Sequence, residues 1–280
     1  MVADLNDDPT EFCVCRYCES YDLKAGVCNI TQNRVGAGYS CPDWKPEPTW
    51  HKDREVIKSK LTKDFCQNVL QLLALRQRGT ATEEIVKHIL TTEHIYTLRS
   101  DEKVEMWIYK DGIYLPAAQT YIKAVCREVV GSAYTPQLSN DIIAKICTDT
   151  YIEPDFFFTV RNPLRFCVAN GIFDLKTCAL ESFNPGEFHF TKIPINYAPE
   201  AKCDRILKFM NEVVSQEDVG VLQEVFGHFL VRDYIQAKAV MCHGSGRNGK
   251  SRLLELMKRF LGLDNCSNIT LQQIEEDNFA

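Results

Sequence analysis

Apolar residues recur every three or four positions in several stretches of the chain, which is the pattern of a helix with one buried face. Thr80 and Glu83 have the spacing of a capping box, so we expect them to begin the second of these helices. Before the glycine-rich segment near residue 245, this pattern predicts six helices, over 61–73, 80–89, 118–130, 139–149, 206–214 and 222–229.

Short apolar runs between these helices predict β-strands. Asp111-Gly112 and Asn170-Gly171 favour tight hairpin turns, because both types of residue tolerate a positive φ. Prolines at 185, 194 and 199 then indicate an extended connector. The predicted strands are 95–98, 104–109, 113–115 and two strands within 166–175.

A glycine-rich loop lies between an apolar run at 239–242 and a helical pattern at 253–261. The loop has the pattern G-x-x-x-x-G-K-S, and a strand before it and a helix after it are the context that a phosphate-binding loop requires. Its glycines would turn backbone N–H groups toward phosphate oxygens. We predict that Lys250 reaches the β- and γ-phosphates and that Ser251 ligates Mg²⁺. The alternative is a glycine loop that precedes a helix by chance. The predicted cradle is Gly244, Ser245, Gly246, Arg247, Asn248, Gly249, Lys250 and Ser251.

Composition narrows the class of protein. A chain of 280 residues with 45% hydrophobic and 25% charged residues is expected to form about two globular domains. It contains no run of 18 apolar residues, so we expect no membrane span and a cytoplasmic location. A net charge of −6 means that any nucleic-acid binding must come from a local patch or an assembled channel.

Five of the 13 cysteines lie between Cys13 and Cys41. A four-thiolate zinc site would let so short a segment fold, because metal binding contributes free energy that a small core cannot. Unrelated reduced cysteines are the alternative, and Cys13 is a spare thiol. The other eight are scattered, which indicates reduced, buried thiols. The predicted zinc ligands are Cys15, Cys18, Cys28 and Cys41.

Two further groups of residues have both a structural and a functional interpretation. The basic residues of 52–63 form either a phosphate-contacting patch or, as we favour, a solvated helix face. Trp107, Tyr109 and Tyr114 could stack on bases, but we expect them to form the core of a hairpin.

The order of several motifs resembles that in the phage/plasmid and poxvirus-type primase-helicases, which are superfamily 3 helicases with AAA+-like ATPase cores. Asn248 before Gly249-Lys250-Ser251 is characteristic of that family. The resemblance covers roughly residues 100–262. Its motifs are Asn170-Gly171-Ile172-Phe173-Asp174-Leu175, Asn196-Tyr197, Gly227-His228-Phe229-Leu230 and Gly244 to Ser251.

The resemblance implies an ATP-dependent DNA helicase that forms hexameric rings on single-stranded or forked DNA during replication of a virus, plasmid or integrated element. Lys250 and Ser251 would be the Walker A lysine and the magnesium ligand. Other replication proteins are possible partners. In this family the Walker B acids, the sensor and the arginine finger lie after Walker A. Only 29 residues follow Ser251, and Glu275-Glu276-Asp277 lacks the apolar strand that would present such acids. We therefore expect a chain that ends inside its motor, and we assign no primase domain before residue 60.

Together these patterns predict an α+β multidomain protein with a zinc ribbon, a mixed middle domain and the start of a P-loop α/β core. The main alternative is a non-catalytic zinc-ribbon protein that binds DNA or a partner and carries a vestigial P-loop. A metabolite or nucleotide kinase is a third interpretation, but such enzymes usually place the P-loop near their start. The expected divisions are an acidic tail (1–12), the zinc module (13–44), a proline-rich linker (45–53), the middle domain (54–199) and the ATPase segment (200–280).

Overall fold

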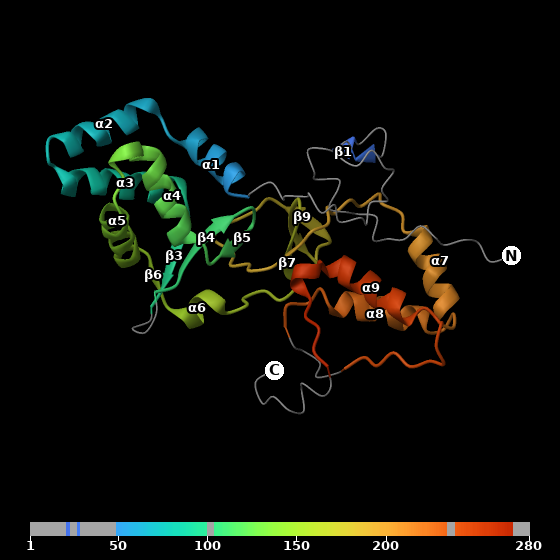
Figure 1. Ribbon diagram of the computed structural model, residues 1–280. Helices are drawn as coiled ribbons and strands as arrows, with labels where there is room; N and C mark the ends of the chain where they lie inside the picture. The colour runs from blue at the N-terminus through green and yellow to red at the C-terminus, as the bar shows by residue number, and fades with distance from the viewer. Residues whose placement is uncertain (1–20, 23–26, 29–48, 100–103, 234–238, 271–280) are drawn as a thin grey trace. The chain divides into compact units, whose positions relative to one another are not determined.

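The computed structural model of the protein describes five stretches of the chain, which are 21–22, 27–28, 49–99, 104–233 and 239–270 (Figure 1). The chain divides into two compact units. One unit contains the described parts of Met1–Leu75 together with Ala124–Tyr134, and the other contains those of Arg76–Lys123 and Thr135–Ala280. The architecture is mixed α+β, as the sequence predicts.

The first unit is mainly helical. Strands β1 (Tyr21–Asp22) and β2 (Val27–Cys28) pair antiparallel, and helices α1 (Thr49–Lys60) and α2 (Lys63–Ala74) follow. Thr62 caps α2, because its hydroxyl accepts a hydrogen bond from the Phe65 N–H. Helix α1 begins inside the segment that we expected to be a linker. The end of α4 (Ala118–Val130) and the short 3₁₀ helix Gly131–Ala133 complete this unit.

The basic residues of α1 are partly engaged within this unit. Arg54 and Lys58 both form ion pairs with Glu128, whose side chain is only 10% exposed. These pairs support the structural interpretation for two of the five basic side chains in 52–63.

The first sheet of the second unit has the strand order β5-β4-β3-β6. All its pairs are antiparallel except β3 with β6. Asp111 and Gly112 form the predicted turn between β4 and β5, with φ values of 49° and 97°. Helices α3 (Arg78–Thr92) and α5 (Pro136–Asp149) belong to the same unit. The strands are β3 (Ile95–Leu98), β4 (Met106–Lys110), β5 (Ile113–Leu115) and β6 (Tyr151–Ile152).

The second sheet has the order β10-β7-β8-β9, and only β10 runs parallel to its neighbour. The hairpin turn between β7 and β8 is centred on Ala169-Asn170, one residue before the predicted position, and Gly171 is the first residue of β8. A Cβ on Gly171 would lie 2.3 Å from the Glu181 carbonyl oxygen, so the glycine is needed for close approach to β9. The strands are β7 (Arg165–Val168), β8 (Gly171–Asp174), β9 (Ala179–Glu181) and β10 (Lys192–Ile193).

An aromatic core packs against the first sheet. Tyr114 and Phe157 are fully buried, and Phe157 lies on the short helix α6 (Pro154–Phe158). Phe188 contacts both rings, with its centroid 5.6 Å from Tyr114 and 4.9 Å from Phe157. Trp107 and Tyr109 pack against this cluster, so the hairpin-core interpretation of these aromatic residues is confirmed.

Three helices form the end of the described chain, and α8 and α9 run side by side (Figure 1). They are α7 (Asp204–Val213), α8 (Val219–His228) and α9 (Lys250–Leu261), followed by the 3₁₀ helix Leu263–Asn265. Each helix contributes to one apolar cluster, which contains Met210, Leu222, Leu253 and Met257. The two helices predicted within 200–230 and the helix after the glycine-rich loop are therefore confirmed.

Several local predictions are wrong. Helix α3 begins at Arg78 with Gln77 as its N-cap, so Thr80 lies inside the helix and no capping box forms. Residues 239–243 form no strand, because none of the described strands lies beside them to complete a hydrogen-bonded ladder. The side chain of Met241 in this run is 85% exposed.

The scattered cysteines are free thiols, as predicted, but not all are buried. Cys126, Cys147 and Cys167 are buried, whereas Cys178 and Cys203 are exposed. The acidic tail, most of the zinc module and Glu275-Glu276-Asp277 lie outside the described residues. None of the helices that the structure describes is long and apolar enough to cross a membrane.

Candidate functional site

The glycine-rich loop leads directly into α9. Gly249 is the N-cap of this helix, with φ of 85°, and Lys250 is its first residue. The Lys250 ammonium folds back over the loop and donates hydrogen bonds to the Gly244 carbonyl at 2.9 Å and to Asn248 Oδ1 at 2.7 Å. The lysine therefore lies where the loop and the positive end of α9 meet.

Two of the loop glycines lie in close contact with other side chains. A Cβ on Gly244 would lie 1.7 Å from Asn248 Nδ2 and 3.1 Å from the Lys250 Nζ, so a larger residue would force these two side chains to move. A Cβ on Gly249 would lie 2.3 Å from a methyl group of Val213 on α7. The left-handed conformation of Gly249 also disfavours any larger residue.

Three features of the loop favour phosphate binding, but the strand expected before it does not form in 239–243. A tight glycine turn, a lysine ammonium and the N-terminus of a 12-residue helix converge at one place. The Ser251 side chain is exposed at the same end of α9. The structure thus brings together Lys250 and Ser251 with the glycines predicted from the sequence.

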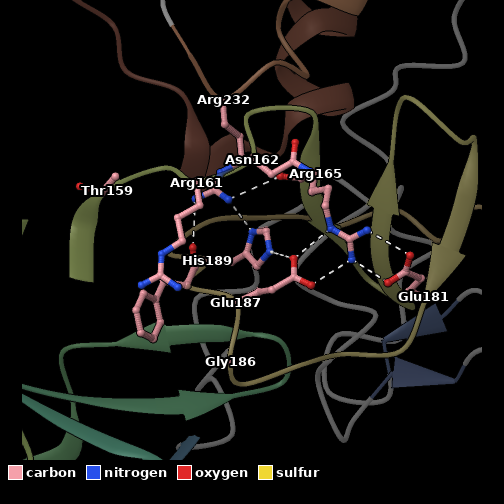
Figure 2. Close-up of a pocket in the computed structure, with 10 residues that line it drawn as sticks. Thr159, Arg161, Asn162, Arg165, Glu181, Gly186, Glu187, His189 and Arg232 are labelled. Atoms are coloured by element: carbon pink, nitrogen blue, oxygen red, sulfur yellow. Dashed lines mark hydrogen bonds and ion pairs between the residues drawn. The ribbon is translucent and has the colours of Figure 1, made fainter. Parts of the chain in front are cut away.

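A second candidate site is a cavity of about 460 Å³ in the second unit (Figure 2). Charged side chains come to it from β7, β9, the connector after β9 and the segment after α8. The sequence predicts no role for any of these side chains. The charged and titratable residues that line the cavity are Arg161, Arg165, Glu181, Glu187, His189 and Arg232.

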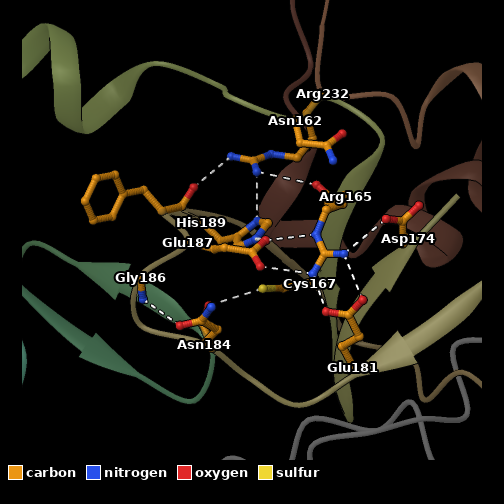
Figure 3. Close-up of polar contacts among 12 residues, drawn as sticks. Asn162, Arg165, Cys167, Asp174, Glu181, Asn184, Gly186, Glu187, His189 and Arg232 are labelled. Carbon is orange, nitrogen blue, oxygen red and sulfur yellow. Dashed lines mark hydrogen bonds and ion pairs between the residues drawn. The ribbon is translucent and has the colours of Figure 1, made fainter. Parts of the chain in front are cut away.

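Arg165 is the centre of the ion-pair network beside this cavity (Figure 3). Its guanidinium donates two hydrogen bonds of 3.0 Å to Glu187, bonds of 3.0 and 2.7 Å to Glu181, and one of 3.0 Å to Asp174. The side chains of Arg165 and Asp174 are each only 12% exposed. Hydrogen bonds from Arg165 lower the pKa of Glu181. Desolvation raises the pKa of Asp174, but hydrogen bonds from backbone N–H groups and from Arg165 outweigh it, so the pKa of Asp174 is lowered as well.

His189 is held between Arg232 and Glu187 (Figure 2). Arg232 Nη1 lies 2.8 Å from His189 Nδ1, and its Nη2 donates to the Phe188 carbonyl. Because a guanidinium only donates, Nδ1 must accept and the neutral imidazole carries its proton on Nε2. Burial and the charge of Arg232 lower the pKa of His189 to about 4. The ring is therefore neutral at pH 7.

The Nε2 atom of His189 is buried and has no hydrogen-bond partner among the described residues. The closest carboxylate oxygen, Glu187 Oε2, is 3.6 Å away, which is too far for a hydrogen bond. His189 is only 2% exposed. A buried donor without a hydrogen bond is costly to a fold.

One part of the charged cluster around Arg165 could be predicted from the sequence. Arg165 and Asp174 lie opposite each other in the β7–β8 hairpin, and a correctly centred turn predicts that pair. Glu187, His189 and Arg232 gave no such signal, because they lie in segments without regular periodicity.

Comparison of the sequence with known protein families identifies the family of this chain. Residues 48–215 match the family described as D5 N terminal like. The match covers more than half of the chain, which therefore belongs to this family. The domain occurs in phage and viral primase-helicase proteins, and the chain is accordingly of the primase-helicase type. A search of curated proteins gave no match.

The predicted zinc site involves none of the residues of the two candidate sites. The proposed zinc ligands lie outside the residues whose side chains the structure describes. Within the part that it does describe, no group of three or more His, Cys, Asp or Glu residues is arranged to hold a metal ion.

Proposed function

We propose that the protein acts in DNA replication as part of an ATP-dependent superfamily 3 helicase, and that its loop 244–251 binds Mg-ATP. The observation that carries the proposal is the position of Lys250, whose ammonium lies over a glycine turn at the start of α9. The family match supports the replication role, because this domain occurs in primase-helicase proteins.

The loop backbone, Lys250 and Ser251 have different roles in this proposal. The backbone N–H groups of the loop and of the first turn of α9 would surround the phosphates. Lys250 would exchange its contacts with Gly244 and Asn248 for phosphate oxygens, so that its charge is available where negative charge develops. The Ser251 hydroxyl would hold Mg²⁺, which neutralises phosphate charge when bound.

The proposal also includes partners. A helicase of this type is expected to bind single-stranded or forked DNA, to assemble as a hexamer and to work with other replication proteins. The four cysteines at 15, 18, 28 and 41 remain the proposed zinc ligands. A zinc-dependent DNA- or partner-binding protein with an inactive P-loop is the competing proposal, and it predicts no effect of Lys250 on DNA binding.

Nucleotide binding tests the proposal directly. We expect Lys250→Ala to weaken the binding of a fluorescent ATP analogue at least tenfold in a magnesium-containing titration, because an ion pair with phosphate is lost. Lys208→Ala removes the same charge from an exposed position on α7 and should leave the affinity unchanged. Equal affinities for wild type and Lys250→Ala would contradict the ATP site and favour the zinc-dependent alternative.

A further inference from the structure

The side chain of Asn248, in the glycine-rich loop, has one engaged atom and one unengaged atom. Its Oδ1 accepts a hydrogen bond from the Lys250 ammonium at 2.7 Å. Because an ammonium only donates, this contact fixes which end of the amide is the oxygen. The other end, Nδ2, carries two N–H donors, and no hydrogen bond from it to the described residues is found. Asn248 is an exposed residue, so the loop has an unused amide donor next to its lysine.

The unused Nδ2 lies over the first glycine of the loop. A Cβ placed on Gly244 would be 1.7 Å from Asn248 Nδ2 and 3.1 Å from Lys250 Nζ. Lys250 also donates to the Gly244 carbonyl oxygen, at 2.9 Å. Its two contacts use two of the three ammonium N–H groups, so one remains. An amide donor and an ammonium donor therefore lie beside each other over Gly244.

No acidic residue of the loop competes for these donors. The segment 239–254 contains Arg247, Lys250 and Arg252 but no aspartate or glutamate. The first carboxylate that follows it, on Glu255, forms an ion pair with Arg259 of the same helix. Unused N–H donors in a segment with excess positive charge suit an anion whose oxygens accept hydrogen bonds.

The position of Nδ2 beside the lysine indicates which phosphate it would contact. In the proposed ATP site, Lys250 reaches the β- and γ-phosphates, while backbone N–H groups surround the phosphate chain. A donor next to the Lys250 ammonium is within reach of the same oxygens. A nucleoside diphosphate has no γ-phosphate, so it offers fewer acceptors to this pair of donors.

From this geometry we propose that Asn248 makes the loop select a nucleoside triphosphate over a diphosphate, by donating a hydrogen bond from Nδ2 to the terminal phosphate. The inference rests on the proposed binding of Mg-ATP to the loop at 244–251. The phosphate oxygens that draw Lys250 away from Asn248 Oδ1 are the oxygens that Nδ2 meets. Loss of the γ-phosphate removes this contact, so the loop holds the diphosphate product more weakly.

The test compares two nucleotides that differ only in the terminal phosphate. Dissociation constants are measured in the presence of Mg²⁺ for ribose-labelled fluorescent ADP and for the matching triphosphate with a β,γ-imido bridge, which resists hydrolysis. The readout is the ratio of the two constants within one protein sample, because a loss of folded protein affects both constants alike. For the wild type we expect the triphosphate to bind at least tenfold more tightly.

Variants at position 248 assign this preference to the amide. Asn248→Ala should lower the ratio about tenfold, because the hydrogen bond to a charged phosphate is lost for the triphosphate alone. Its removal of the Oδ1 contact with Lys250 affects both nucleotides alike. Asn248→Asp keeps an acceptor for Lys250 but replaces the donor by a charged oxygen, so its ratio should be lower still.

Asn211→Ala is the matched control, since it removes the same side chain from an exposed position on α7, where Nδ2 bonds the Leu207 carbonyl, and it should leave the ratio unchanged. A wild type without preference for the triphosphate, or an Asn248→Ala variant that keeps the wild-type ratio, would overturn this proposal and leave the ATP site standing. A wild type that binds neither nucleotide would overturn the ATP site itself, and this inference with it.

Discussion

The loop at 244–251 and the cavity beside Arg165 are built on different principles. The polar contacts of Lys250 join residues two and six positions apart, and the loop is largely exposed. In the cavity, Arg165 joins residues 9, 16 and 22 positions away, and Arg232 reaches back 43 positions to His189. The first site is a local motif, whereas the second exists only when strands β7 to β9, the connector after β9 and the segment after α8 are in place.

This difference has an energetic consequence. The charges of the cavity depend on one another, so removing one leaves others without a partner in a partly buried place. The charge of Lys250 is near solvent, so its loss should affect binding more than folding.

Arg165→Ala should destabilise the protein by roughly 3 kcal/mol, because three carboxylates lose the cation that compensates them. The measurement is the free energy of unfolding in urea at pH 7. Arg99→Ala is the matched control, since it breaks an exposed pair with Glu153 and should cost less than about 1 kcal/mol. Similar losses for both variants would mean that partial burial of the charges around Arg165 adds nothing to the cost of removing it.

The free energy of unfolding of the protein should depend on pH through His189. Its pKa is about 4 in the folded protein and about 6.5 when unfolded, so the unfolded chain binds the proton more readily between these values. Stability is then complete above pH 6.5 and falls as the pH drops toward 4, by about 2 kcal/mol between pH 6.5 and pH 5.

His189→Asn provides the reference for this pH dependence. Asparagine retains an acceptor for Arg232 but does not titrate, so the difference in unfolding free energy between wild type and variant should shrink as the pH falls from 6.5 to 5. A difference that stays constant over this range would mean that His189 is not held neutral by its surroundings.

Gly249→Ala should destabilise the protein by about 1.5 kcal/mol, through the positive φ at this position and the close contact with Val213. The midpoint of thermal unfolding measures the effect. Gly220→Ala in α8 is the control, because nothing lies within 4 Å of the added Cβ and alanine favours a helix. If Val213→Ala, added to Gly249→Ala, restores none of the lost stability, the close contact between residue 249 and α7 contributes nothing to that loss.

The same contrast explains how far the sequence could predict the structure. Helical periodicity and the Asp111-Gly112 turn are local signals, and the helices and the first hairpin form as predicted. The described residues 239–243 before the loop form no strand, because a strand depends on a neighbour that local pattern cannot supply. Thr80 fails as a cap because α3 continues two residues further toward its N-terminus.

The two sites differ in the same way. The residues of the loop could be named from a short motif, and Lys250 contacts Gly244 and Asn248 within that motif. Glu187 and His189 lie in a connector whose prolines predicted only extended chain, and their meeting with Arg232 depends on tertiary packing. A polar cluster assembled over 70 residues of chain gives no periodic signal.

Each unit contains a buried cysteine whose alkylation rate reports how often that unit opens. Burial raises the pKa of Cys126 to about 12 in one unit, and burial raises that of Cys167 to about 12 in the other, where its Sγ donates to the Gly112 carbonyl. Only about one molecule in 10⁵ carries either thiolate at pH 7, so alkylation at these positions must wait for the surrounding fold to open. The exposed Cys178 reacts without that delay. Labelling rates at Cys126 and Cys167, each referred to Cys178, therefore time the opening of the two units separately in one sample.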